Sequence, residues 1–137
     1  MERSQTLKIL FDTNVFLWHV FADRKLGRKT KRLLERVDSE LWLSPITLWE
    51  CLILERDGRV QLEPNALRWV RDILTKHELR EAPLNHEVAL HTRIINVEND
   101  DPADRFLAAT AAVYDLTLVT SDGPLLKGSG YSVLPNE

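Results

Sequence analysis

The fold is decided by LKILFDTN, the stretch from Leu7 to Asn14. Its first five residues are mostly apolar and a polar turn follows, a pattern typical of a short buried strand. Asp12 therefore stands at the carboxyl end of the first strand. Aspartate is also among the best helix N-caps, so Asp12 can cap a helix that starts near Thr13. The stretch alone leaves both roles of Asp12 open.

Short apolar runs alternate with segments of helical periodicity over the rest of the chain. Further strands are expected at residues 41–43, 79–84, 116–119 and 131–134. Helices are expected at residues 15–21, 29–37, 45–56 and 106–114, with two more opened by Pro64 and capped by Asn85. This alternation predicts an α/β fold, a three-layer α/β/α domain with a central, mainly parallel sheet. With no repeat and no linker, residues 1–137 are expected to form one domain.

The composition is that of an ordinary folded protein. A chain of 137 residues can bury a core, and 44% hydrophobic with 28% charged residues leaves no segment biased towards disorder. Met1 to Lys8 lacks the apolar stretch of a signal peptide, and no apolar run is long enough to cross a membrane. We therefore expect a cytoplasmic protein without a membrane partner. Cys51, the single cysteine, is expected to pack in the core.

The net charge of -3 argues mildly against nucleic-acid binding, which normally depends on Lys and Arg. Two divalent cations held by acidic residues would reverse that sign. Seven of the 18 basic residues also gather in one segment: Arg24, Lys25, Arg28, Lys29, Lys31, Arg32 and Arg36. The segment predicts either a basic face near an acidic site or a solvated helix surface.

Three aspartates occupy positions where an α/β fold places ligands, just beyond the carboxyl ends of strands or at the start of a helix. Asp12 and Asp122 each follow a predicted strand, and Asp104 lies in the first turn of a predicted helix. Each has a structural explanation as well, because Asp122 lies in a turn-like Ser121–Pro124 segment and the helix dipole favours Asp104. Asp101 already serves as the expected cap of that helix, so Asp104 is not needed for capping.

Glu50 has the weakest structural explanation of the acidic residues. On a helix its neighbours on the same face are Ile46, Thr47, Ile53 and Leu54. No Lys or Arg lies within one turn on that face, since Arg56 and Arg59 are expected to point elsewhere or lie beyond it. The carboxyl group must therefore be protonated, paired with a base from another segment, or bound to a cation.

Four carboxylates favour Mg²⁺ or Mn²⁺ over zinc, which prefers His and Cys ligands. The four histidines have no ligand-like spacing and are expected at the surface or at the edge of the core: His19, His77, His86 and His91. Carboxylate-bound magnesium usually serves phosphate chemistry, which points to hydrolysis of a phosphodiester bond.

Four local motifs resemble those of a known family. They are LFDTN at residues 10–14, SPITLWE at 44–50, DPADRFLAATAA at 101–112 and LVTSD at 118–122. Their order and spacing span nearly the whole chain. On these motifs the sequence resembles the PIN-domain ribonucleases, and closely the VapC toxins of VapBC toxin–antitoxin systems.

The resemblance implies a set of site residues and partners. It makes Asp12, Glu50, Asp104 and Asp122 both the catalytic and the metal-binding residues, with Asn14, Thr120 and, more weakly, Asp101 in support. It implies an endoribonuclease that uses Mg²⁺ or Mn²⁺, forms a homodimer, acts as a toxin, and is inhibited by a VapB-like antitoxin in its active-site groove. One difference is Asn99, where many relatives have His, followed by an additional acid, Asp100.

Other functions fit the sequence less well. A haloacid-dehalogenase-like phosphatase requires a second aspartate two residues after the first, where this chain has Asn14. A receiver-like phosphoacceptor requires paired acids and a positioned lysine, and neither is evident. The remaining alternative is a catalytically silent PIN-like module that binds protein or RNA, for which a broken acidic set is expected. Here the acidic set is complete.

Overall fold

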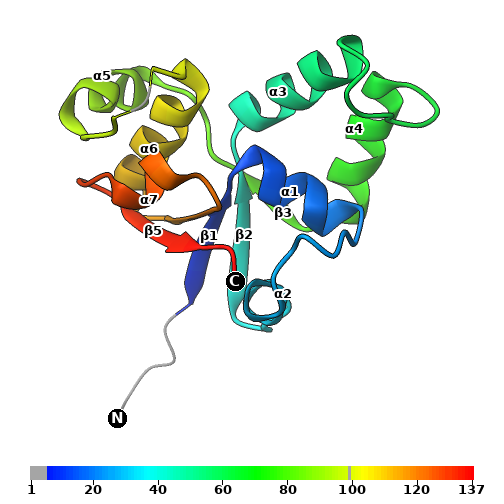
Figure 1. Ribbon diagram of the computed structural model, residues 1–137, viewed down its shortest axis with the longest axis horizontal. Coiled ribbons are helices and arrows are strands. Elements are labelled where there is room, and N and C mark those ends of the chain that lie inside the picture. The colour runs from blue at the N-terminus through cyan, green and yellow to red at the C-terminus, as the bar shows by residue number, and fades with distance from the viewer. Residues whose placement is uncertain (1–5, 99) are drawn as a thin grey trace.

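A five-stranded parallel sheet forms the centre of the molecule (Figure 1). The structure is a computed structural model that describes residues 6–98 and 100–137. The strands are β1 (Leu7–Phe11), β2 (Ser39–Leu43), β3 (Leu79–Glu81), β4 (Thr117–Thr120) and β5 (Ser132–Pro135), in the spatial order β3-β2-β1-β4-β5. The first strand is therefore central, and it pairs with β2 on one side and β4 on the other.

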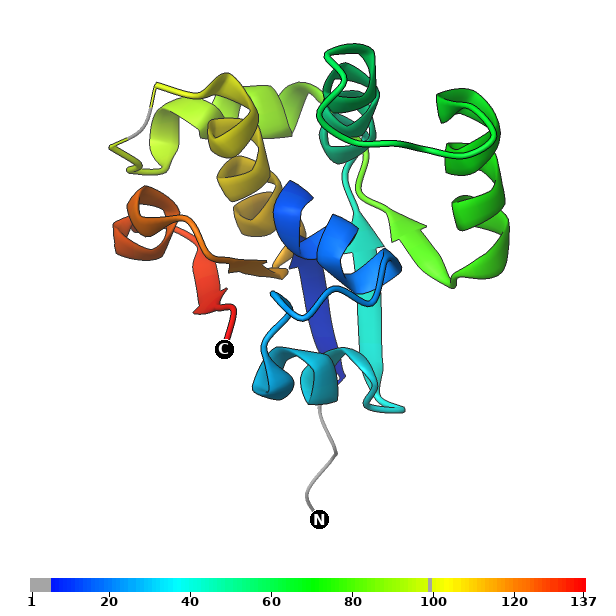
Figure 2. The ribbon, with the colours of Figure 1, turned by 45° about the vertical axis from the view of Figure 1, so that its right-hand side comes forward.

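Helices cover both faces of this sheet, as Figures 1 and 2 show. They are α1 (Thr13–Val20), α2 (Arg28–Leu34), α3 (Pro45–Arg56), α4 (Ala66–Lys76), α5 (His86–Ile94), α6 (Pro102–Tyr114) and α7 (Gly123–Lys127). Ile9 and Phe11 point into a core shared with α1 to α4, whereas Leu10 points into a second core shared with α5 to α7. Alternate residues of a strand face opposite sides. The predicted three-layer α/β/α architecture is confirmed.

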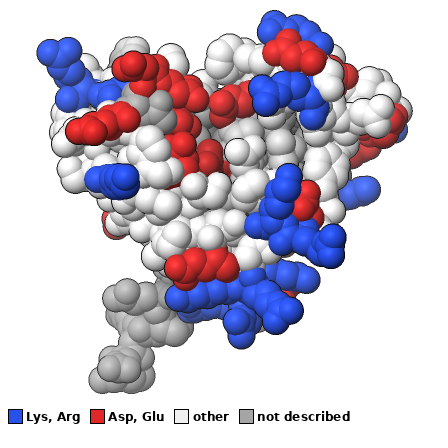
Figure 3. Space-filling model, in the orientation of Figure 1, with Lys and Arg blue, Asp and Glu red and all other residues white. Residues whose placement is uncertain are grey.

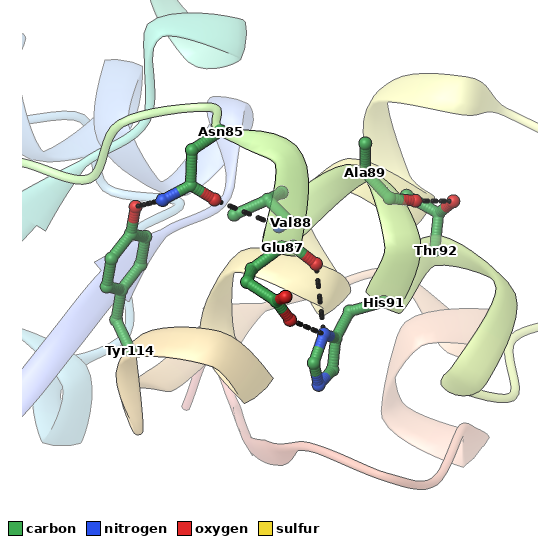
Figure 4. Close-up of polar contacts among 7 residues, drawn as sticks. All are labelled: Asn85, Glu87, Val88, Ala89, His91, Thr92 and Tyr114. Carbon is green, nitrogen blue, oxygen red and sulfur yellow. Dashed lines mark hydrogen bonds and ion pairs between the residues drawn. The ribbon is translucent and has the colours of Figure 1, made fainter.

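The second core is closed by polar contacts between α5 and α6 (Figure 4). Asn85 caps α5, because its Oδ1 accepts a hydrogen bond from the backbone N–H of Val88 at 3.0 Å. Its Nδ2 donates to the Tyr114 hydroxyl at 3.1 Å, and that hydroxyl donates to the Pro83 carbonyl at 2.6 Å. The predicted cap is therefore confirmed, and it also joins the start of α5 to the end of α6.

Several predicted boundaries are corrected by the structure. Strand β3 ends at Glu81 and not at residue 84, since Pro83 has no N–H to continue the ladder. Helix α4 begins at Ala66 and not at Pro64, because Asn65 is the N-cap and accepts from the Arg68 N–H. Helix α2 ends at Leu34 and not at residue 37.

The basic segment was expected either near the acidic residues or on a solvated helix surface, and the structure supports the second. It lies on and around α2, which leads directly into the amino end of β2. The carbonyl of Asp38, just before β2, accepts from the N–H of Leu7 at the amino end of β1. Figure 3 shows this concentration of Lys and Arg at the lower end of the molecule, away from the acidic hollow. The start of the segment is held by the end of the chain, because the Oδ1 of Asn136 accepts from the Gly27 N–H at 2.8 Å. None of the seven basic residues lines the acidic pocket, so the segment forms a separate, solvated surface.

Two expectations concern residues outside the described part of the chain. Asn99 is one, and most of the N-terminal stretch, residues 1–5, is the other. Among the described residues, no helix is long and apolar enough to cross a membrane.

Candidate active site

The predicted acidic residues line a single pocket at the carboxyl end of the sheet. The pocket has a volume of about 620 Å³, which is within the usual range of small-ligand sites. It is lined by Asp12, Thr13, Asn14, Trp49, Glu50, Ile53, Leu54, Arg59, Asp101, Pro102, Ala103, Asp104, Ser121, Asp122 and Gly123. Figure 3 shows acidic side chains in the hollow between the helices labelled α6 and α3 in Figure 1. All four predicted acids and two of the three supporting residues thus line one pocket.

Asp12 caps a helix and faces the pocket at the same time. It follows β1 directly and is 7% exposed. Its Oδ1 accepts from the Thr13 N–H at 2.7 Å, which caps α1, while its Oδ2 accepts from the Thr120 hydroxyl at 2.6 Å. Burial raises the pKa of Asp12, while the hydrogen bonds from Thr120 and Thr13 act in the opposite direction. The cap that the sequence left open is therefore confirmed, and the same side chain also faces the pocket.

Thr120 is the supporting residue that does not line the pocket, and it connects two residues that do. It is the last residue of β4 and is fully buried. While its hydroxyl donates to Asp12, the same oxygen accepts from the backbone N–H of Asp122 at 3.0 Å. Thr120 thus fixes the Asp12 carboxylate and the loop that carries Asp122.

Asp122 differs from its expected setting. The segment that follows β4 was interpreted as a turn, but Asp122 is the N-cap of a short helix, α7. Its Oδ2 accepts from the Leu125 N–H at 3.1 Å, and Pro124 occupies the first turn. The Gly-Pro pair is compatible with both structures, and a five-residue helix is too short to have a recognisable apolar period.

Glu50 is half-buried on α3 and points towards the start of α1. Its carboxylate accepts a short hydrogen bond from the Thr13 hydroxyl. Burial raises the pKa of Glu50, the bond from Thr13 opposes this, and the negative charges of Asp101 and Asp12 add to it. Ile53 and Leu54 line the same pocket, so the largely apolar helix face predicted for Glu50 is confirmed.

Helix α6 contributes Asp101 and Asp104 to the pocket. Asp101 is the predicted N-cap, and its Oδ1 accepts from the Ala103 N–H at 3.0 Å. Asp104 lies in the first turn and is half-buried. Its pKa is raised to about 7, first by burial and then by the negative charges of the neighbouring acids: Asp101, Asp12, Asp122 and Glu50. The charges that act on Asp104 thus come from its own helix and from three other segments that line the same pocket.

Nine of the 15 residues that line the pocket were not identified from the sequence as part of the site, and three of them bear on its chemistry. Thr13 appeared only as a helix start, and Trp49 only within the SPITLWE motif. Arg59 was expected to lie beyond the face of Glu50, but it lines the same pocket. The signal for Thr13 was its position beside Asp12, whereas Arg59 arrives through the turn after α3, which helical periodicity does not describe.

The remaining sequence predictions concern Cys51 and the histidines. Cys51 is fully buried in the core under α3, and burial raises the pKa of its thiol to about 12, so it is a packing residue. His86 is exposed, and His91 lies beside Glu87 on the surface of α5, as Figure 4 shows. His19 and His77 are half-buried at the edge of the first core, with ring centroids 5.9 Å apart.

The donor set of the pocket fits a hard divalent cation better than any other group. Carboxylate oxygens from four segments surround it, and these are the ligands that Mg²⁺ and Mn²⁺ prefer. Within the described residues, however, no three His, Cys, Asp or Glu side chains are grouped tightly enough to hold an ion as they stand. Binding of an ion would therefore have to draw these carboxylates closer together.

Comparison with known proteins identifies the family. A family model for the PIN domain matches residues 9–127, and this range contains all four acids. The chain belongs to the PIN-domain family. Ribonuclease VapC22 of Mycobacterium tuberculosis (strain ATCC 25618 / H37Rv) is 28% identical to this PIN domain over 114 residues, which cover 83% of this chain and 86% of that protein.

Solved structures confirm the PIN fold. VapBC2 from Rickettsia felis, bound to a DNA fragment from its promoter, has a chain with a TM-score of 0.70 and 12% identity, covering 96% of this chain and 100% of that one. DNA-bound VapBC from Salmonella typhimurium has a TM-score of 0.62 and 20% identity, covering 94% and 98%. A toxin–antitoxin complex from Klebsiella pneumoniae has a TM-score of 0.61 and 22% identity, also covering 94% and 98%. These similarities show that the PIN domain has the architecture of such chains.

Proposed function

We propose that this PIN domain is a divalent-metal-dependent endoribonuclease that acts as the toxin of a type II toxin–antitoxin pair. The observation that carries the proposal is the meeting of four carboxylates, distant in sequence, in one pocket: Asp12, Glu50, Asp104 and Asp122. The relative VapC22 is named a ribonuclease, and several chains of the same fold come from VapBC complexes. A catalytically silent binding module would not need to keep all four acids.

The four carboxylates would hold Mg²⁺ or Mn²⁺ in this function. A bound ion would supply an activated water and offset the charge that develops on the phosphate in the transition state. Asn14 and Asp101, at the rim of the pocket, and Thr120, behind Asp12, would have supporting roles.

The protein groups around the acids fix their orientation. Thr120 and the Thr13 N–H hold the two oxygens of Asp12, so this carboxylate cannot rotate without losing both hydrogen bonds. The Thr13 hydroxyl holds Glu50 from the same turn. Positioned groups contribute to catalysis because the cost of ordering them is met by folding and not during the reaction.

The proposed partners follow from the same relatives. We propose a VapB-like antitoxin as inhibitor, a homodimer as the active form, and the cytoplasm as the place where RNA is cleaved. The complexes with solved structures contain both toxin and antitoxin chains of this type.

The test compares cleavage of single-stranded RNA by the purified protein with Mg²⁺, with Mn²⁺ and with a chelator. We expect cleavage only with a divalent ion, and we expect Asp12→Asn to abolish it while the protein remains folded, because asparagine retains the cap. Asp57→Asn, which changes an acid outside the pocket, is the control. Metal-independent cleavage, or full activity of Asp12→Asn, contradicts the proposal.

A further inference from the structure

The wall of the pocket formed by α3 carries an exposed tryptophan. Trp49 is 55% exposed, whereas the other three tryptophans are buried or half-buried: Trp18, Trp42 and Trp69. Among the described residues, no other aromatic ring packs against Trp49, although Trp42 and Trp69 both have such a partner. An exposed indole that stabilises no core is a sign of a binding surface.

The position of Trp49 joins this indole to the acidic residues. Trp49 and Ile53 are one helical turn apart on α3, and both line the pocket that contains the four carboxylates. Pro102, at the start of α6, lines the same pocket. A phosphate held at the carboxylates would therefore bring its own nucleotide against an apolar wall.

Arg59 adds a positive charge to this wall. It is the sole basic residue among those that line the pocket, and it is exposed. No ion pair joins it to any of the described residues, whereas Arg56, three positions earlier, is paired with Asp57 and lies outside the pocket lining. The Arg59 guanidinium is thus available to an incoming anion in a site that is otherwise strongly acidic.

We propose that Trp49 and Arg59 form a nucleotide-binding wall beside the four acidic residues and position the RNA at the cleavage point. Trp49 stacks on a base next to the scissile phosphate, and Arg59 contacts a neighbouring phosphate. Unpaired bases are recognised in this way, because a base within a duplex has its faces covered by its neighbours. This inference rests on the proposed ribonuclease activity and adds the residues that position its substrate. The proximity of the wall to the carboxylates and its isolated cation favour RNA over a peptide as the ligand.

The indole is tested with Trp49→Leu, which keeps an apolar side chain but removes the aromatic face, and Trp49→Phe, which keeps a ring. We expect Trp49→Leu to raise KM for single-stranded RNA roughly 5- to 150-fold, the range for loss of one stacked base, and Trp49→Phe to retain most of the affinity. Leu67→Ala removes another exposed apolar side chain, on α4 and away from the pocket, and serves as the control.

The base is tested with the unchanged protein and RNA oligonucleotides that lack one base at successive positions around the cleavage site. Loss of the base that stacks on Trp49 should weaken binding by the same factor as Trp49→Leu, and should have no further effect in that variant. This comparison does not depend on the folding of any variant.

The phosphate contact of Arg59 is tested by comparing Arg59→Gln with Arg56→Gln. Loss of one phosphate contact lowers the dependence of log K on log salt concentration by about 0.7 for single-stranded nucleic acid. We expect this decrease for Arg59→Gln and no change for Arg56→Gln.

The outcomes separate this inference from the proposed function. If the unchanged protein cleaves no RNA with Mg²⁺ or Mn²⁺, both are overturned. If it cleaves RNA but Trp49→Leu and the RNAs that lack a base behave like the originals, the nucleotide-binding wall alone is overturned. If Trp49→Leu cleaves normally but escapes inhibition by the antitoxin, the wall binds the antitoxin and not RNA, which also overturns the inference. Coupled losses of the base and the indole support it.

Discussion

At the scale of single residues, the site depends on side chains that each make two kinds of contact. Asp12 uses one oxygen to cap α1 and the other to accept from Thr120. From the sequence alone, the cap and a functional role of Asp12 were alternatives, because a sequence pattern describes one position at a time. The positions of Asp12 and Glu50 were predictable from a strand end and an apolar helix face, whereas the bonds that orient them through Thr13 and Thr120 required the fold.

Thr120→Val tests the connection between Asp12 and Asp122. Valine has nearly the shape of threonine but leaves a buried carboxylate oxygen and a backbone N–H without their partner. We expect a loss of about 1–3 kcal/mol in the free energy of unfolding and a lower kcat. Chemical denaturation and cleavage rates measure the two effects.

Thr117→Val is the matched control for this variant. Thr117 lies on the same strand, is only half-buried, and does not line the pocket. Equal effects of the two substitutions on cleavage would show that Thr120 has no orienting role.

At the scale of elements, the pocket is built from the starts of helices. Asp12, Asp101 and Asp122 are the N-caps of α1, α6 and α7, and all three face the same hollow. A cap was predictable from the sequence where a proline follows it or where the helix is long enough to show a regular apolar spacing, as in α6. Helix α7 was not, because five residues after Asp122 contain too few positions to distinguish a helix from a turn.

Asp101 and Asp104 provide a test within one helix. Asp101→Asn keeps an oxygen that accepts from the Ala103 N–H, so we expect near-normal stability and most of the cleavage activity. Asp101→Ala loses the cap and should cost about 0.5–2 kcal/mol in thermal or chemical unfolding.

Asp104→Asn should abolish cleavage with little loss of stability, since it removes a proposed metal ligand and leaves the cap intact. Cleavage assays and unfolding curves of the three variants are compared side by side. A larger loss of activity in Asp101→Asn than in Asp104→Asn would contradict this assignment, because it would make Asp101 the more important acid for cleavage.

At the scale of the whole molecule, charge is divided between two separate regions. The acidic pocket lies at the carboxyl end of the sheet, and the basic segment on and around α2 forms a surface that does not line this pocket (Figure 3). The net charge of -3 sums the charges of both regions, so it was a poor guide to what either region can bind. Sequence patterns predicted the layers correctly, but the separation of the two charged regions follows from the path of the chain between β1 and β2.

The proposed toxin activity can be tested in living bacteria. Expression of the unchanged protein should arrest growth, Asp12→Asn should not, and a co-expressed cognate antitoxin should restore growth. Growth curves with matched protein levels measure the effect. Normal growth with abundant folded protein would argue against the toxin role while leaving the nuclease assay to decide the chemistry.

The stability of the domain should depend on pH through His19. Burial and the nearby His77 lower the pKa of His19 from 6.5, while the charge of Glu35 partly opposes them. The unfolded chain then binds more protons than the folded protein as the pH falls below about 6.5, so this group reduces stability in acid. We expect His19→Gln to reduce the difference in Tm between about pH 7.5 and about pH 5.5.

His86→Gln, at an exposed position on α5, is the control for this measurement. Any loss of the packing between His19 and Phe11 acts at both pH values and cancels in the difference. An unchanged pH dependence of Tm in His19→Gln would rule out this histidine as the source.

The strand order determines when, during synthesis of the chain, the proposed active site becomes complete. Strand β1 is synthesised before the other four strands, but it occupies the middle of the sheet and lacks a neighbour on one side until β4 has been synthesised. Thr120 and Asp122, which complete the surroundings of Asp12, emerge with that same late segment. A nascent or prematurely released chain that stops before β4 therefore lacks part of the pocket, so the proposed activity requires synthesis to have passed Asp122.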